Sequence, residues 1–159
     1  MFDVYCRPLR ATLPIMSTPT LIYPRSPRET MSGWVYLPRF IDKIRLHLAG
    51  KLHPDYQPNF AHKGFDAAWL KAAGLGAEQF IEVVRGTVTD GEVADWVSKN
   101  VTTGEAARKG FADYLLTLGS GPDEGVRARL KTRKEEAGLG HRTEIQTFVD
   151  FIDADEKRI

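Results

Sequence analysis

Residues 37–50, LPRFIDKIRLHLAG, constrain the fold more than any other segment of this 159-residue chain. Apolar residues recur there at the three- and four-residue spacing of an α-helix, which predicts a buried stripe. The stripe consists of Leu37, Phe40, Ile41, Ile44 and Leu48. Pro38 suits a first helical turn, and Gly50 suits the position after the last one. Leu46 falls on the opposite side. We expect residues 21–23, Leu-Ile-Tyr, to cover this second side, so that the helix lies at the centre of the domain.

Six further segments combine helical spacing with start or stop signals. They are expected at 66–73, at 77–85, after Thr89, after Thr102, at 122–137 and around Ile145, Phe148, Val149 and Ile152. Thr89 with Glu92, and Thr102 with Glu105, match the capping-box pattern, and Asp66 is a candidate cap. No segment shows convincing alternation of period two. The predicted fold class is all-α, a compact bundle of about seven short helices with a proline-rich extended N-terminal arm.

Residues 1–32 form this arm, since they contain five of the nine prolines and no helical periodicity. Proline lacks an amide N–H and fixes φ, so we expect an extended chain, with 1–22 disordered. The remaining residues, 33–159, are expected to form a single helical domain in which 51–63 is a loop. Met16 is an alternative start, so the sequence leaves open whether 1–15 belong to the natural product.

Length and composition indicate a globular protein. A chain of 159 residues, 42% of them hydrophobic and 27% charged, can bury a core without a metal or disulfide. The single cysteine, Cys6, excludes an intramolecular disulfide and is typical of a reducing compartment. No apolar run reaches membrane-spanning length, and the one after Arg10 is too short for a signal peptide. We therefore predict a cytoplasmic protein that has no membrane partner.

The net charge of +1 conceals an asymmetry along the chain. Residues 1–63 contain nine Lys/Arg against four Asp/Glu, and residues 64–159 contain thirteen against seventeen. A basic half of this kind can recognise an anionic partner. The other interpretation is that the two parts attract each other within one fold, and the frequency of paired surface charges favours it.

The chain resembles the bacterial family catalogued as domain of unknown function 5069. Four motifs in the same order carry the resemblance: YPRSPRE (23–29), LPRFIDKIRLHLAG (37–50), DGEVADWV (90–97) and TFVDFIDADE (147–156). It covers residues 23 to 156. The resemblance implies a bacterial cytosolic helical protein, and it brings no activity, cofactor or catalytic residue.

Charged side chains around the central helix are the main candidates for a site. Partly buried charges must be paired or must bind something, and this helix carries Arg39, Asp42, Lys43 and Arg45. One interpretation is an internal ion-pair network in which Asp42 reaches Arg39 or Arg45, three residues away. Such a network would also hold the arm through Glu29.

The functional interpretation is a pocket for a carboxylate or phosphate, which the planar fork of arginine grips with two hydrogen bonds. The candidate ligand-binding residues are Arg28, Arg39, Asp42, Lys43 and His47. In an enzyme, Asp42 or His47 would carry protons, because histidine titrates near neutral pH and burial raises the pKa of a carboxylate. This interpretation predicts a closed, dry pocket between the first helix and residues 53–63.

The sequence gives little support for a metal site or for an interface with nucleic acid. His53, Asp55 and His62 are the only neighbouring candidates for metal ligands, and their spacing matches no metal motif, so we expect no metal or other cofactor. The basic run RARLKTRK (127–134) has acidic neighbours and no interleaved aromatic residue, which favours a solvated helix over a nucleic-acid interface. The acidic stretch DFIDADE (150–156) lacks the glycine of a calcium loop, and we expect it to be solvated too.

Phosphate-loop, nucleophile-elbow and zinc-protease motifs are absent from the sequence, which favours a protein that is not an enzyme. The function stays unknown, and two hypotheses remain. The first is an accessory protein that binds an unidentified protein partner through its basic N-terminal half. It predicts that Arg39→Ala and Lys43→Ala reduce partner capture without loss of stability, whereas unfolding would indicate the internal network. The alternative is a small-molecule binding protein or enzyme with an anionic ligand near Arg39, Lys43 and His47.

Overall fold

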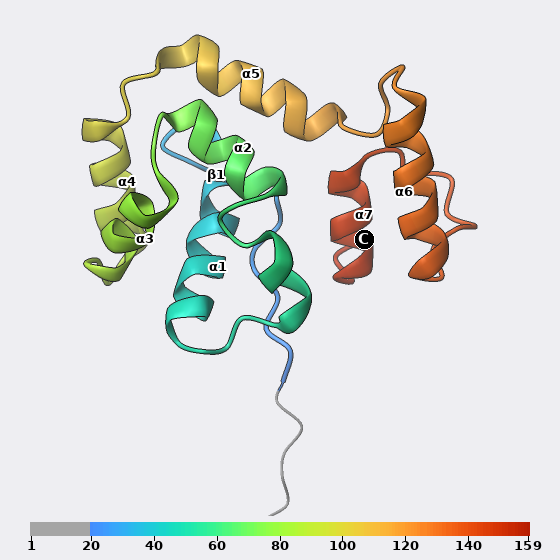
Figure 1. Ribbon diagram of the computed structural model, residues 1–159, viewed down its shortest axis with the longest axis horizontal. Helices are drawn as coiled ribbons and strands as arrows, with labels where there is room; N and C mark the ends of the chain where they lie inside the picture. The colour runs from blue at the N-terminus through green and yellow to red at the C-terminus, as the bar shows by residue number, and fades with distance from the viewer. Residues whose placement is uncertain (1–19) are drawn as a thin grey trace, which may run out of the picture.

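A computed structural model describes residues 20–159 of the chain (Figure 1). Within this range the chain forms seven α-helices, one 3₁₀ helix and one short hairpin, which confirms the all-α fold. The elements in chain order are β1 (Thr30–Met31), β2 (Trp34–Val35), α1 (Leu37–Leu48), the 3₁₀ helix η1 (Pro54–Asn59), α2 (Gly64–Ala73), α3 (Ala77–Arg85), α4 (Asp90–Asn100), α5 (Gly104–Thr117), α6 (Glu124–Glu136) and α7 (Phe148–Asp155). The expectations for residues 1–19, including those for Cys6 and Met16, lie outside the described residues.

Helix α1 packs between α2 and α3 through its predicted stripe. Phe40, Ile41 and Ile44 are completely buried. The ring of Phe40 lies edge-on to Trp69 of α2, with centroids 5.7 Å apart, and 5.5 Å from the ring of Phe80 of α3. Complete burial of each such side chain contributes about 1.5–3 kcal/mol, so tertiary packing holds α1 in place.

Leu46, on the other side of α1, is half-buried and packs against the hydrophobic core. The predicted second packing contact is therefore confirmed. Residues 21–23, which we expected to cover it, are exposed. The arm instead meets α1 one turn earlier, where Arg25 donates hydrogen bonds to Asp42 from its backbone and its side chain.

The hairpin β1–β2 begins in the predicted arm and ends in the predicted domain. Its two turn residues, Ser32 and Gly33, have φ values of 52° and 76°, and positive φ at both positions is typical of the type I′ hairpin turn. The hairpin brings Trp34, which is 2% exposed, to 5.6 Å from the ring of Trp69. The last residues of the arm, which form β1, are thereby held against the core through β2.

The capping predictions had different outcomes. The Thr89 hydroxyl accepts a hydrogen bond from the Glu92 amide, and the Glu92 carboxylate accepts one from the Thr89 amide, which confirms the first capping box. The second box is wrong, because α5 starts from Thr103, whose side chain makes no capping hydrogen bond. Residues 51–63 are not wholly a loop, since η1 lies within them.

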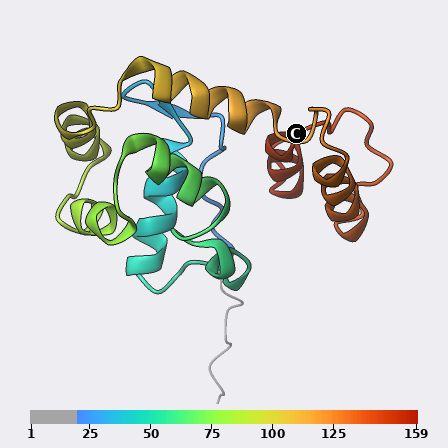
Figure 2. The same ribbon diagram turned by 45° about the horizontal axis from the view of Figure 1, so that its top comes forward.

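Helix α5 joins two groups of helices (Figures 1 and 2). It packs on α2, in the group α1–α4, and on α7, which packs against α6. The turn after α5 contains Gly119 with φ 109°, where an added Cβ would lie 2.8 Å from Leu130 Cδ2. This turn lets α6 and α7 fold back, so that α7 faces α1 and η1. None of the helices in residues 20–159 has the length and apolar character needed to cross a membrane.

Candidate functional site

A cleft of about 960 Å³ lies between α1, η1 and the start of α2 on one side and α6 and α7 on the other. The end of α5 and the arm complete its lining. The cleft occupies the place where the anionic-ligand hypothesis expected a closed, dry pocket, between α1 and residues 53–63. It is open to solvent instead, because exposed side chains such as those of Lys63 and Arg133 contribute to its walls.

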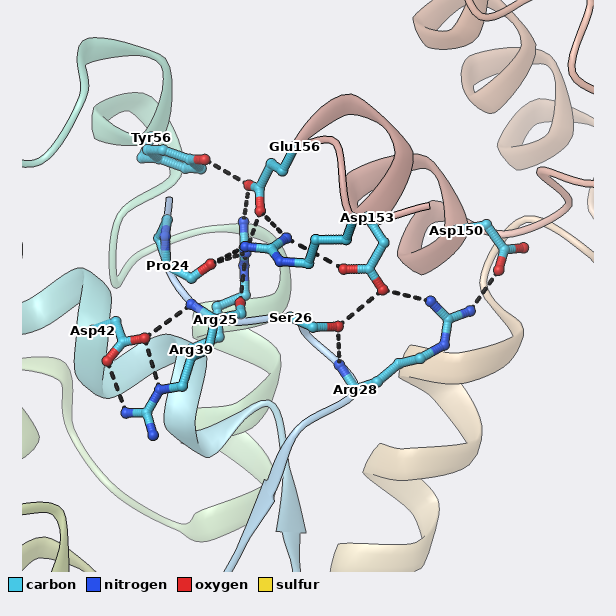
Figure 3. Close-up of polar contacts among 11 residues, drawn as sticks. Pro24, Arg25, Ser26, Arg28, Arg39, Asp42, Tyr56, Asp150, Asp153 and Glu156 are labelled. Atoms are coloured by element: carbon cyan, nitrogen blue, oxygen red, sulfur yellow. Dashed lines mark hydrogen bonds and ion pairs between the residues drawn. The ribbon is translucent and has the colours of Figure 1, made fainter. Parts of the chain in front are cut away.

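Arg39 and Glu156 form a buried ion pair in this cleft (Figure 3). Each side chain is only 4% exposed. The two terminal nitrogens of Arg39 donate to the two carboxylate oxygens at 2.6 and 2.9 Å, and Nη1 also donates to the Arg25 carbonyl at 2.8 Å. The Tyr56 hydroxyl donates to Glu156 Oε1 at 2.5 Å, and Arg158 donates to Oε2. Burial alone would raise the pKa of Glu156, but these donors, Arg39 first among them, bring it below its ordinary value.

Lys43 and Asp66 form a second buried pair one turn further along α1. Lys43 Nζ lies 2.5 Å from Asp66 Oδ2, and the Asp66 side chain is 0% exposed. Asp66 also accepts hydrogen bonds from the Tyr36 hydroxyl at 2.6 Å and from the Ala61 amide at 2.9 Å. Burial lowers the pKa of Lys43 although Asp66 opposes this, and burial with the Asp66 charge raises the pKa of Tyr36 far above its ordinary value. Asp66 is therefore not the predicted helix cap, because its carboxylate points into the core.

The arm is attached to the rest of the fold by two arginines. Arg25 pairs with Asp42 and with Asp90, both at 2.8 Å. Arg28 pairs with Asp150 at 2.5 Å and with Asp153 at 2.7 Å, and both acids belong to α7 (Figure 3). These contacts link the arm to α1, α4 and α7.

The internal ion-pair network exists, but its pairings differ from those we expected. Asp42 pairs with Arg25 of the arm, while Arg39 pairs with Glu156. Arg45 pairs with Asp90 at 2.6 Å. Glu29, the expected holder of the arm, instead accepts a hydrogen bond from the Tyr36 amide through its backbone carbonyl. The helical spacing within α1 identified none of these partners, because they come from other segments.

The structure separates the five candidate ligand-binding residues. Arg39 and Lys43 line the cleft. Arg28 and Asp42 belong to the attachment of the arm. His47 is exposed, and its ring stacks on Phe60 with centroids 4.4 Å apart, outside the set of residues that lines the cleft.

Three residues of the site were not predicted as part of a binding site: Tyr36, Asp66 and Glu156. Glu156 lies in the acidic stretch that we expected to be solvated, and that expectation is wrong for Asp153 and Glu156, which are 4% and 7% exposed. The sequence contains a signal for this burial. Asp153 and Glu156 lie four and seven positions after the buried Val149, and residues at this spacing share one face of a helix. A carboxylate on a buried face requires a cationic partner.

The candidate metal ligands do not gather into a site. His53 Nδ1 lies 3.4 Å from Asp55 Oδ2. His62 follows η1 in the chain, and its side chain is exposed. Among residues 20–159, no group of three His, Cys, Asp or Glu side chains lies close enough together to hold a metal ion.

Cations and aromatic rings from α2, α5, α6 and α7, and from the residue before α2, line another part of the cleft. Lys63, Arg129 and Arg133 supply positive charge, and the Arg129 guanidinium lies 5.7 Å from the ring centre of Phe148. Further aromatic side chains in the lining are Phe65, Tyr114 and Phe151. Acidic residues are present as well, since Asp55 and Asp155 line the cleft where η1 meets α7. The cleft thus offers charge of both signs together with apolar surface.

The fold and this cleft define a helical protein in which charged and aromatic side chains from both ends of the sequence converge. A family model described as "Domain of unknown function (DUF5069)" matches residues 22–158. The protein belongs to this family, and the resemblance found in the sequence is confirmed. No curated protein matches the chain.

Proposed function

We propose that the protein binds a small anionic molecule with an aromatic or apolar body in the cleft between α1 and α7, and that it acts in the bacterial cytoplasm. The observation that carries the proposal is the lining of the cleft, in which cations lie next to aromatic rings. Sites for small molecules are concave and mostly apolar, with a few polar groups that fix orientation. The volume, about 960 Å³, is also in the range of such sites.

Two cations of the lining are the best candidates to hold the anionic group. Within residues 20–159, Lys63 and Arg129 have no carboxylate within ion-pair distance, whereas Arg39 and Lys43 are already paired. The anionic group is therefore expected at Lys63 and Arg129, and the apolar body beside Phe148. Arg39 and Lys43 form the base of the cleft, where the protonated hydroxyl of Tyr56 can also face a ligand.

The hypothesis of a protein partner bound through the basic N-terminal half has weaker support. In the described part of the arm and in α1, its cations are paired with carboxylates of the same chain. These cations are Arg25, Arg28, Arg39, Lys43 and Arg45. A binding surface needs charge that is free to meet the partner. Native mass spectrometry of the protein captured from its own cells tests this alternative, since a heavier complex would support a protein partner and a small added mass would support a ligand.

Calorimetric titration with phenyl phosphate and with benzoate tests the proposal, with benzyl alcohol as the uncharged control. We expect both anions to bind more tightly than the alcohol. Lys63→Met and Arg129→Met should each weaken binding of phenyl phosphate about fivefold, because a partly exposed charge contributes up to about 1 kcal/mol. Lys109→Met, which removes an exposed lysine of α5 outside the cleft, is the matched control. Equal affinity for the anions and the alcohol, or an effect of Lys109→Met as large as that of Lys63→Met, would refute the proposal.

A further inference from the structure

We propose that Lys43 is a reactive amine that captures an aldehyde or ketone as an imine, the carbonyl compound being one that also carries an anionic group and an aromatic or apolar body. This inference rests on the proposed function, since it assigns a carbonyl group to the ligand of the same cleft. It adds a covalent step that anion binding alone does not require.

The position of Lys43 favours this chemistry. Lys43 belongs to the residues that line the cleft, and its side chain is only 6% exposed, so it is mostly removed from water at the edge of the space for a ligand. Its Nζ lies 6.0 Å from the ring centre of Tyr56, and the guanidinium of Arg39 lies 5.7 Å from the same ring. Burial and a neighbouring cation are the two conditions that activate lysines as nucleophiles.

Asp66 supplies the second requirement, a fixed proton acceptor beside the amine. Its Oδ2 lies 2.5 Å from Lys43 Nζ, and the carboxylate is held in place by the Ala61 amide and the Tyr36 hydroxyl. The ammonium group of a lysine must lose a proton before its lone pair can attack carbon, and a carboxylate at this distance can receive it. The lowered pKa of Lys43, caused first by burial, points in the same direction.

The step balances without an oxidant or reductant. The Lys43 nitrogen forms a bond to the carbonyl carbon, the π electrons of C=O move to oxygen, and that oxygen takes up the proton that nitrogen loses. Asp66 then returns the proton that it received to the carbinolamine hydroxyl, which leaves as water. The C–O bond breaks, and the nitrogen lone pair forms the C=N bond of a protonated imine. Each imine formed therefore consumes one carbonyl group and releases one water molecule.

The competing explanation is a purely structural pair that joins α1 to α2. The two explanations differ in the reactivity that they predict. A lysine locked in a structural pair should react more slowly than the exposed lysines, whereas an activated amine should react faster. Lys63, in the same cleft, and Lys109, outside it, are the internal standards.

The test uses pyridoxal 5′-phosphate as probe, because it combines an aldehyde, an aromatic ring and a phosphate. The intact native protein is incubated with a limiting amount, imines are reduced with borohydride, and peptides are mapped by mass spectrometry. We expect the label on Lys43 to exceed that on Lys63 and Lys109 several-fold. Lys43→Arg should lose this label. Circular dichroism shows whether the variant is folded, and the map of the unaltered protein decides the question if it is not.

Label on Lys63 or Lys109 in amounts equal to or above that on Lys43 would overturn the inference. The failure of the inference can be distinguished from the failure of the proposed function. If phenyl phosphate binds while Lys43 stays unlabelled, only the imine step is wrong. If phenyl phosphate does not bind and Lys43 stays unlabelled, both are wrong.

Discussion

Replacing Arg39 with methionine tests whether the buried pair Arg39–Glu156 stabilises the fold. Arg39→Met keeps an apolar stem in place but leaves Glu156, which is 4% exposed, with only Tyr56 and Arg158 as donors. Removing one partner of a buried pair costs about 3–5 kcal/mol, and because Arg158 remains we expect the lower value, about 3 kcal/mol. For a chain of this length, the loss corresponds to a melting temperature lower by about 6–12 °C.

Urea unfolding, followed by fluorescence of the buried tryptophans and by far-UV circular dichroism, measures this loss. The double variant Arg39→Met/Glu156→Leu should recover most of it, because no charge is then left buried without its partner. Arg85→Met is the matched control. Arg85 pairs with Glu82 at 2.9 Å, but the two side chains are 58% and 64% exposed, so the change should cost less than about 1 kcal/mol.

Two outcomes would refute the reasoning. In the first, Arg39→Met costs no more than Arg85→Met, and in the second the double variant is as unstable as the single one. A stable Arg39→Met protein that has lost the capture of a protein partner would instead support the accessory-protein hypothesis.

Three further changes test other parts of the structure. The folded-state pKa of Glu156 lies below its ordinary value of 4.5, so the ionised carboxylate stabilises the fold above that pH and this stabilisation is lost as the pH falls. Glu156→Gln should therefore flatten the acid branch of a plot of unfolding free energy against pH. The pKa of Tyr56 is raised above its ordinary value of 10.0, first by burial, so the protonated hydroxyl stabilises the fold below pH 10.0 and this stabilisation is lost as the pH rises. Tyr56→Phe should flatten the alkaline branch of the same plot, and an unchanged slope would contradict the raised pKa. Gly119→Ala places a side chain at φ 109° with its Cβ only 2.8 Å from Leu130 Cδ2, and it should lower the free energy of unfolding in urea by about 2–4 kcal/mol. The control is Gly121→Ala, which should cost less because its added Cβ meets no atom within 4 Å.

Local rules predicted the parts of the fold that depend on neighbours in sequence. The stripe of α1 and the capping box at Thr89 were correct, because the residues that form each of them lie within a few turns of one another. The hairpin at 30–35 escaped prediction because two-residue strands are too short to show alternation. Its turn, Ser32-Gly33, was the only local signal.

The site was less predictable, because its partners lie far apart in the sequence. Arg25 and Asp42 are 17 residues apart, and Arg39 and Glu156 are 117 apart. Arg39 and Lys43 could be identified as charges on a central helix that needed partners. Their partners could not be chosen among the many acids of the chain. For Lys43 the choice depends on how α2 packs beside α1, and for Arg39 it depends on how α5 returns the chain toward α1.

The pairing of Arg39 with Glu156 has a consequence for how the protein is made. Ribosomes add about 5–20 residues per second, so α1 and the arm precede Glu156 by roughly 6–24 s of synthesis. During this interval Arg39 has no carboxylate of α7 to pair with, and desolvation of its guanidinium would be unfavourable. Arg39 should therefore stay hydrated on the nascent chain until Glu156 emerges, and only then can its side of the cleft close.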